Sequence, residues 1–173
     1  MNKKVTSALT SAIMISLILI VLDLIAGFSN IKFTTWYRWI PTIIFCIGII
    51  IVCISYANQN DNLVTFGNVF GHGFKTTAII AALMLVYTLL SIYVIFPDTK
   101  EKYIDEMRRQ MEAKGNLSED TVNNAVEMTS KFFLVGATIG AVIGTLIGGA
   151  IASLLGAAFA KKKPASPFDQ PTT

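Results

Sequence analysis

The stretch that decides the fold is the last apolar segment, residues 132–160, which reads FFLVGATIGAVIGTLIGGAIASLLGAAFA and is followed by three lysines. Small residues recur in it at every fourth position: Gly136, Gly140, Gly144, Gly148, Ala152 and Gly156. In lipid, helices associate through close packing and hydrogen bonds, and small residues let two backbones approach each other. The pattern therefore predicts a transmembrane helix with a glycine zipper that is contacted along its length.

The composition extends this interpretation to the whole chain. Only 14% of the 173 residues are charged, against about 25% in a soluble domain. Four apolar runs approach or exceed the roughly 17–20 residues that a membrane span needs: 6–28, 39–56, 76–96 and 132–160. Backbone groups in lipid must be satisfied within the segment, which favours helices, and barrel-type strands of about 10 alternating residues are absent. We expect an all-α polytopic membrane protein.

The connection at 97–131 predicts an extramembrane helical hairpin between the third and fourth spans. Pro97 ends the third span, and Asp98 or Thr99 can cap the helix that follows. Gly115 is suited to a left-handed helix stop. Ser118 then caps a second helix that runs on into the fourth span.

Two other segments are assigned from their composition. Phe66, Phe70 and Phe74 recur at helical spacing before the third span, which predicts a short separate helix lying in the membrane interface. Residues 1–163 form one four-helix transmembrane domain, and the proline-rich tail, 164–173, is expected to be disordered.

The lysines orient the chain. Four spans put both termini on one side, and Lys3, Lys4 and Lys161–Lys163 favour the cytoplasm for that side. The six basic residues of the predicted hairpin argue in the opposite direction. Because the basic residues lie mostly at helix ends, the net charge of +3 is no sign of nucleic-acid binding.

Asp23 is the one ionisable residue well inside a predicted span, which makes it a functional candidate. It lies about five residues from the end of its helix, and Arg38 or Lys32 across a short connection could pair with it. A structural ion pair and a proton or ion role both stay open.

The remaining reactive side chains predict no catalytic site. His72, the only histidine, is expected at the surface or against lipid headgroups. Cys46 and Cys53 lie about 10 Å apart on one helix, too far for a disulfide. Neither a nucleophile–base pair nor a metal, phosphate or cofactor motif occurs. We therefore expect no enzyme activity, no metal and no cofactor.

The partner of the zipper is open between another helix of this chain and another chain. The first helix offers a matching stripe of small residues: Ala8, Ala12 and Ser16. As an antiparallel neighbour it would meet the half from Gly148 to Gly156. Each four-residue step drifts by about 40° around the helix, so one straight partner cannot contact the whole zipper. The half from Gly136 to Gly144 is expected to meet a third helix or another chain.

Several motifs in a fixed order resemble the domain of unknown function 4199 family of small bacterial membrane proteins. They are Met1–Lys4 before a long apolar helix, Thr65–Gly67, Phe70–Phe74, Pro97-Asp98, the methionine-rich charged hairpin, and the glycine-rich last helix with its terminal lysines. The resemblance covers nearly the whole chain. It implies a four-helix protein of the bacterial inner membrane and supplies no activity, so no site residue is carried over.

Two functions compete at this point. The zipper, the hairpin and the missing catalytic groups favour a structural or accessory subunit of a membrane assembly, which contacts other membrane proteins or itself through the last helix or residues 97–131. The alternative is a small transporter or oligomeric channel with Asp23 as its intramembrane polar group.

Overall fold

The computed structural model describes residues 5–29, 31–32, 34, 36–37, 39–113, 115 and 118–160. These residues are helical and contain no strand, which confirms the all-α class. The elements are α1 (Ala8–Phe28), α2 (Trp39–Gln59), α3 (Phe66–Leu90), the π-helical turn η1 (Ser91–Ile95), α4 (Thr99–Glu112) and α5 (Glu119–Phe159). Four helices are long and apolar enough to cross a membrane: α1, α2, α3 with η1, and α5.

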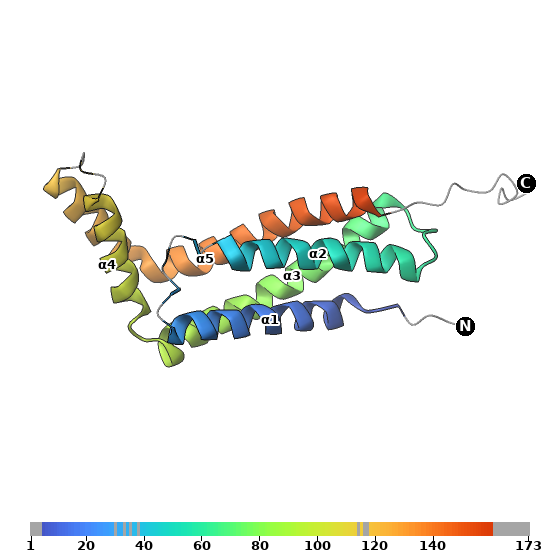
Figure 1. Cartoon of the computed structure of the whole chain (residues 1–173), viewed down its shortest axis with the longest axis horizontal. Helices are drawn as coiled ribbons and strands as arrows, with labels where there is room; N and C mark the ends of the chain where they lie inside the picture. Colours follow the sequence, from blue (N-terminus) through green and yellow to red (C-terminus); the bar gives the residue numbers. More distant parts are fainter. Residues whose placement is uncertain are drawn as a thin grey trace, which may run out of the picture.

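These four helices form an elongated bundle, and α4 leans away from one end of it (Figure 1). We call the end with α4 the hairpin end, and the end where α1 begins and α5 stops the terminal end. α3 contacts α1, α2 and α5, whereas α1 and α5 are not neighbours along their lengths. At the terminal end, Gln59 of α2 accepts a hydrogen bond from the Thr6 backbone N–H at 2.6 Å.

The helix boundaries follow local signals in the sequence. Ser7 and Thr65 cap α1 and α3, each accepting a hydrogen bond from the backbone N–H three residues on. Asp61 and Asn62 adopt positive φ angles of 55° and 61° in the turn between α2 and α3, a conformation that Asp and Asn tolerate better than most residues. Pro41 lies in the first turn of α2, where its missing N–H costs little.

The separate interfacial helix expected around Phe66, Phe70 and Phe74 is wrong. Residues 66–90 form one uninterrupted helix, α3. No proline stands between Phe74 and the apolar run that follows, and the Thr76 hydroxyl donates to the His72 backbone oxygen within the helix and does not cap a new one. Gly73, which has low helix propensity, lies against Cys53 and Ser153, and that close packing compensates for it.

The bundle core at the terminal end is a seam of small residues where α2, α3 and α5 meet. A Cβ atom at Gly149 of α5 would collide with the Thr77 side chain of α3. A Cβ at Gly156 would lie 2.6 Å from Cys53 Cβ and 3.1 Å from Ile50 Cα of α2. Glycine is therefore required at both positions by the closeness of the neighbouring helices.

The structure corrects the predicted partner of the zipper. Ala8, Ala12 and Ser16 are buried, but α1 packs on α3 and α2 and does not lie along Gly148–Gly156. The buried residues of α5 at this end are Gly149, Ala152, Ser153, Gly156 and Ala157. They recur at steps of three and four, the spacing of a coiled-coil seam. The seam therefore shares Ala152 and Gly156 with the four-residue repeat and adds Gly149, Ser153 and Ala157, which lie outside it.

The helical hairpin forms as expected from 97–131. Gly115 has a positive φ of 66°, and Ser118 caps α5 by accepting a hydrogen bond from the Thr121 N–H. α4 packs along the start of α5, where the Tyr103 and Phe133 rings lie 5.7 Å apart. α5 then continues unbroken over 41 residues into the bundle.

Candidate functional site

The candidate site lies at the hairpin end, where η1 turns the chain from α3 into α4. Pro97 disfavours a helical conformation for the residue before it, and Phe96 is extended, with φ −133° and ψ 72°. Its ring lies directly on Gly27 of α1, where a Cβ atom would collide with it. The same ring packs edge-on against Phe28, with centroids 5.2 Å apart. Phe96 thus fixes the end of α3 against the end of α1.

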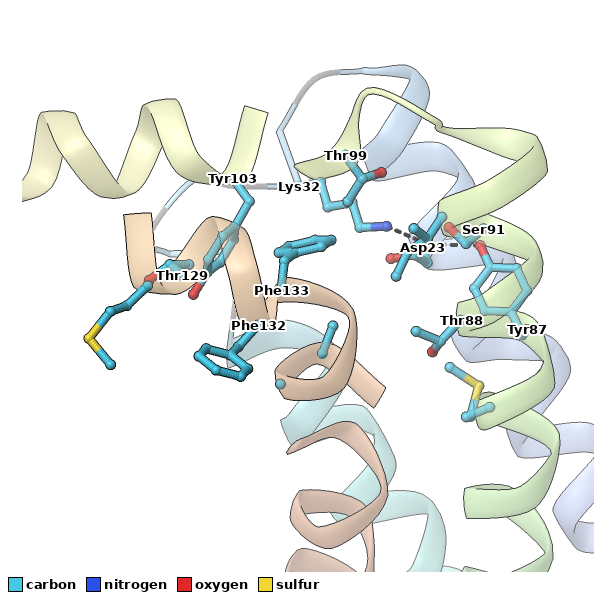
Figure 2. A pocket seen from close by; sticks show the side chains of 15 residues that line it. Asp23, Lys32, Tyr87, Thr88, Ser91, Thr99, Tyr103, Thr129, Phe132 and Phe133 are labelled. Atoms are coloured by element: carbon cyan, nitrogen blue, oxygen red, sulfur yellow. Dashed lines mark hydrogen bonds and ion pairs between the residues drawn. The ribbon is translucent and has the colours of Figure 1, made fainter. Parts of the chain in front are cut away.

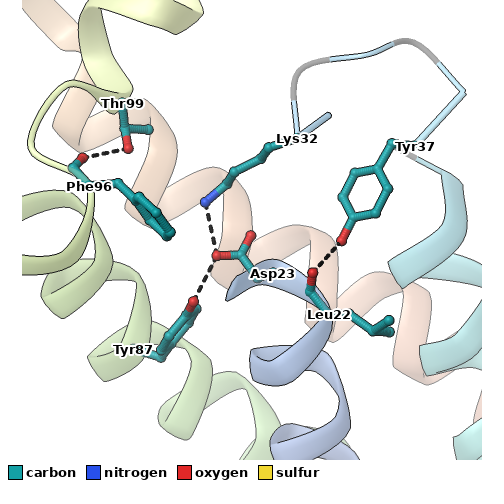
Figure 3. A network of polar contacts seen from close by, with 7 residues as sticks. All are labelled: Leu22, Asp23, Lys32, Tyr37, Tyr87, Phe96 and Thr99. Atoms are coloured by element: carbon teal, nitrogen blue, oxygen red, sulfur yellow. Dashed lines mark hydrogen bonds and ion pairs between the residues drawn. The ribbon is translucent and has the colours of Figure 1, made fainter. Parts of the chain in front are cut away.

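This ring also helps to hold a charged pair. The Lys32 ammonium lies 5.3 Å from the centroid of the Phe96 ring, within the range of a cation–π contact. The ammonium donates to Asp23 Oδ2 at 2.9 Å, and the Tyr87 hydroxyl donates to the same oxygen at 2.8 Å (Figure 3). Asp23 is therefore held by a cation and a phenol from two different segments.

Tyr37 closes the neighbouring side of the site. Its hydroxyl donates to the Leu22 backbone oxygen at 2.8 Å, and the side chain is buried although the residue lies in the connection between α1 and α2. Burial, and then the nearby Asp23 carboxylate, raise the pKa of Tyr37 above its ordinary value of 10.0. The phenol therefore stays protonated and remains a donor at neutral pH.

A cleft of about 640 Å³ adjoins this pair between α3–η1 on one side and α5 on the other (Figure 2). Asp23, Lys32 and Tyr87 line its polar wall, and Phe132 and Phe133 of α5 face them across the space. A second, smaller cavity of about 300 Å³ lies beneath α4 and also borders Asp23 and Lys32. The ion pair therefore forms a wall shared by two cavities.

Ser91, the first residue of η1, adds a weakly satisfied hydroxyl to the larger cleft. It lines the cleft and is 3% exposed. Its Oγ interacts with the Tyr87 hydroxyl, but it makes no hydrogen bond of good geometry to a described residue. A buried hydroxyl that is poorly satisfied is costly, so it marks a place where an additional polar atom would be stabilised.

The other residues singled out in the sequence lie elsewhere. His72 is at the terminal end of α3, half-buried and stacked on Tyr56 with ring centroids 4.0 Å apart. Cys46 and Cys53 are free thiols, and Cys53 is fully buried. Arg38, the other proposed partner of Asp23, falls outside the described residues. Asp23 at the hairpin end and His72 at the terminal end therefore lie at opposite ends of the bundle and do not form one site.

Sequence reasoning found Asp23 but missed Tyr87, Ser91 and Phe96. Tyr87 carried a signal, because a phenol inside an apolar span needs a hydrogen-bond partner. The identity of that partner was not visible, since 64 residues separate Tyr87 from Asp23. Phe96 carried a weaker signal through its position before Pro97.

The arrangement is chemically suited to binding a polar group. It offers an acceptor, a cation, a buried hydroxyl and aromatic walls. Over the described parts of the chain, no group of three His, Cys, Asp or Glu side chains could hold a metal ion.

Comparison with known proteins places the chain in a family. No curated protein and no solved structure matches it. The model of one family, described as "Protein of unknown function (DUF4199)", matches residues 5–162. That match covers nearly the whole chain and includes all four candidate spans, and the protein therefore belongs to the DUF4199 family.

Proposed function

We propose that the protein is a non-enzymatic structural or accessory subunit of an assembly in the bacterial inner membrane, and that α5 carries its contact with a second copy. The observation behind this proposal is the state of two glycines. A Cβ atom at Gly140 or Gly144 would meet nothing within 4 Å, and neither residue lines the cleft beside Asp23, as Gly136 does. Each glycine costs a helix up to about 1 kcal/mol relative to alanine, and neither of the two is needed for packing within the chain.

The position of these glycines on the helix supports a contact outside the bundle. Gly140 is nine residues from Gly149, a rotation of about 900° in an ideal helix, which puts the two on opposite faces. Gly149 lies in the seam with α3. Gly140 therefore faces away from that seam.

Isoleucines beside the glycines make this face self-complementary. Ile139, Ile143 and Ile147 each precede a glycine of the zipper and are 50–58% exposed. They form a ridge next to a groove, and the ridge of one copy fits the groove of another when two such helices cross. A symmetric dimer uses the same patch on both subunits, which is why we choose a second copy as the partner.

The orientation is part of the proposal. Lysines precede α1 and follow α5, and both helix ends lie at the terminal end (Figure 1). By the positive-inside rule this end faces the cytoplasm. The hairpin of α4 and α5 then stands on the opposite side of the membrane.

The experiment compares three leucine substitutions in mild detergent. Gly140→Leu and Gly144→Leu add bulk to the proposed interface, and Ala141→Leu adds it one residue further round the helix. We expect the wild type and Ala141→Leu to have the mass of a dimer, and both glycine variants to be monomers with unchanged thermal unfolding. A monomeric wild type, or equal masses for all four proteins, would contradict the proposal.

The cleft beside Asp23 favours transport as the second candidate. Asp23 is already held by Lys32 and Tyr87, however, which favours a structural ion pair. Flux in proteoliposomes that Asp23→Asn abolishes, in protein that stays folded, would reverse this preference.

A further inference from the structure

The two cavities at the hairpin end differ in character and meet at one ion pair. The larger one is walled mainly by apolar side chains, including Met84, Ile92, Phe132 and Phe133. The smaller one, beneath α4, is lined by polar side chains that include Glu106 and Gln110. A molecule that occupied both would have an apolar part in the first and a polar part in the second.

The larger cleft is open along its α5 edge. Met128 and Phe132 line it and are 64% and 56% exposed. Phe132 begins the apolar run of α5, whereas Met128 belongs to the hairpin, so this edge lies where the apolar part of the candidate span begins. An acyl chain can therefore reach the cleft from the bilayer through this edge.

The ion pair keeps unused hydrogen-bonding capacity toward the cavities. Asp23 Oδ2 accepts both known bonds, and Oδ1 makes none to a described residue. An ammonium has three N–H donors, and only one of those on Lys32 is used by Asp23. The buried Ser91 hydroxyl, which interacts with Tyr87 but makes no hydrogen bond of good geometry to a described residue, is a further group with unused capacity.

We propose that this site binds a zwitterionic phospholipid whose headgroup carries a primary ammonium. The phosphate accepts hydrogen bonds from Lys32, the ammonium donates to Asp23 Oδ1, and one acyl chain lies in the cleft between α3 and α5. The opposite charges of the Asp23–Lys32 pair, 2.9 Å apart, complement the two charges of such a headgroup. This inference does not depend on dimerisation through Gly140 and Gly144.

The same geometry discriminates against other headgroups. A quaternary ammonium has no N–H, so it cannot donate to Asp23. The headgroup of phosphatidylglycerol has hydroxyl groups that can donate to Asp23, but they are uncharged, so its phosphate brings a negative charge toward the Asp23 carboxylate without a cation to offset it. Charge-assisted hydrogen bonds contribute about 1.5–3 kcal/mol, so losing one weakens binding at least about tenfold.

The test measures lipid binding to the purified full-length protein by native mass spectrometry in mild detergent. The probes are dioleoyl phosphatidylethanolamine, phosphatidylcholine and phosphatidylglycerol, which share acyl chains and differ in headgroup. We expect phosphatidylethanolamine to bind about tenfold more tightly than either of the others. Equal binding of all three would show that the acyl chains alone decide and would overturn the proposal, as would tighter binding of phosphatidylglycerol.

Two double variants test whether the headgroup preference depends on the Asp23–Lys32 pair. Asp23→Asn combined with Lys32→Gln removes both charges while keeping groups that can hydrogen-bond each other, and it should abolish the headgroup preference. Asp98→Asn combined with Lys102→Gln is the matched control, because that pair has a 2.7 Å ion contact on exposed α4 and does not line the larger cleft. A preference that survives in the first variant, or that is lost in the control, contradicts the site. If the first variant does not fold, the headgroup comparison on the wild type still decides.

Discussion

Gly156→Ala is the most informative single substitution in the seam, because the atoms that it would meet belong to or are bonded to the α2 backbone. The new methyl carbon would lie 2.6 Å from Cys53 Cβ, against the 3.4 Å at which ordinary contact begins, a deficit of about 0.8 Å. It would also lie 3.1 Å from Ile50 Cα. Both atoms are fixed to the α2 backbone, so no side-chain rotation relieves the clash. α5 and α2 must separate.

The expected cost follows from this geometry. Forcing an extra methyl group into a packed core costs about 1–3 kcal/mol. Alanine also raises helix propensity by up to about 1 kcal/mol relative to glycine, which partly masks the clash. Gly71→Ala is the control, because it gains the same propensity while its Cβ meets nothing within 4 Å. The difference between the two variants isolates the packing cost.

The assay is thermal unfolding in detergent. The unfolding is monitored by circular dichroism, because that signal does not depend on Cys53. For a chain of this size, a packing cost of about 2 kcal/mol lowers Tm by about 4–8 °C. We expect Gly156→Ala to unfold that far below Gly71→Ala. Equal unfolding temperatures would refute the close approach of α5 to α2.

Three further predictions test other parts of the structure. In folded protein, a maleimide should label Cys46 and leave Cys53, which is 0% exposed, unlabelled; equal labelling rates would contradict the core. Tyr87→Phe should lower thermal stability more than Tyr37→Phe, because a hydrogen bond to a charged group contributes about 1.5–3 kcal/mol and a neutral one about 0.5–1.5 kcal/mol; the reverse order in unfolding experiments would count against the Asp23 network. Ser118→Ala should cost about 1 kcal/mol by removing the cap of α5, seen as faster hydrogen exchange in its first turn only.

Local signals were enough to predict the helices and the hairpin. Four apolar runs gave the four spans, and the start of α5 followed from a single capping serine, Ser118. The turn before it followed from Gly115, whose positive φ suits glycine. Such features depend on residues a few positions apart, so one sequence contains all the information that they require.

The packing of the bundle could not be predicted in the same way. The regular repeat predicted a packing role for Gly148 and none for Gly149. In the structure, Gly149 is the residue that lies against Thr77. No packing role was predicted for Gly73, yet it lies against Cys53 and Ser153. Which helix faces which depends on all the side chains of a bundle together, and no pair of positions in one sequence determines it.

Only part of the candidate site could be predicted, because its residues come from separate segments of the chain. A carboxylate inside an apolar run is costly, so Asp23 stood out by itself. Its partners come from two other segments, the connection that holds Lys32 and the span that holds Tyr87. Their assembly depends on Phe96 lying on Gly27, a contact between residues 69 positions apart in the sequence.

The two spacings in α5 explain how one helix can hold a bundle together and still present a free glycine face. Contacts within the chain recur at steps of three and four, from Gly149 to Ala157, while the glycine repeat keeps a strict step of four. A step of four rotates by about 40° per repeat, so the two series must diverge along the helix. They run close together at Gly156, which α2 covers, and are far apart by Gly140, which no described atom of the chain covers. A neighbour that follows the seam therefore does not also cover Gly140, which leaves that position free for the contact with a second copy that we propose.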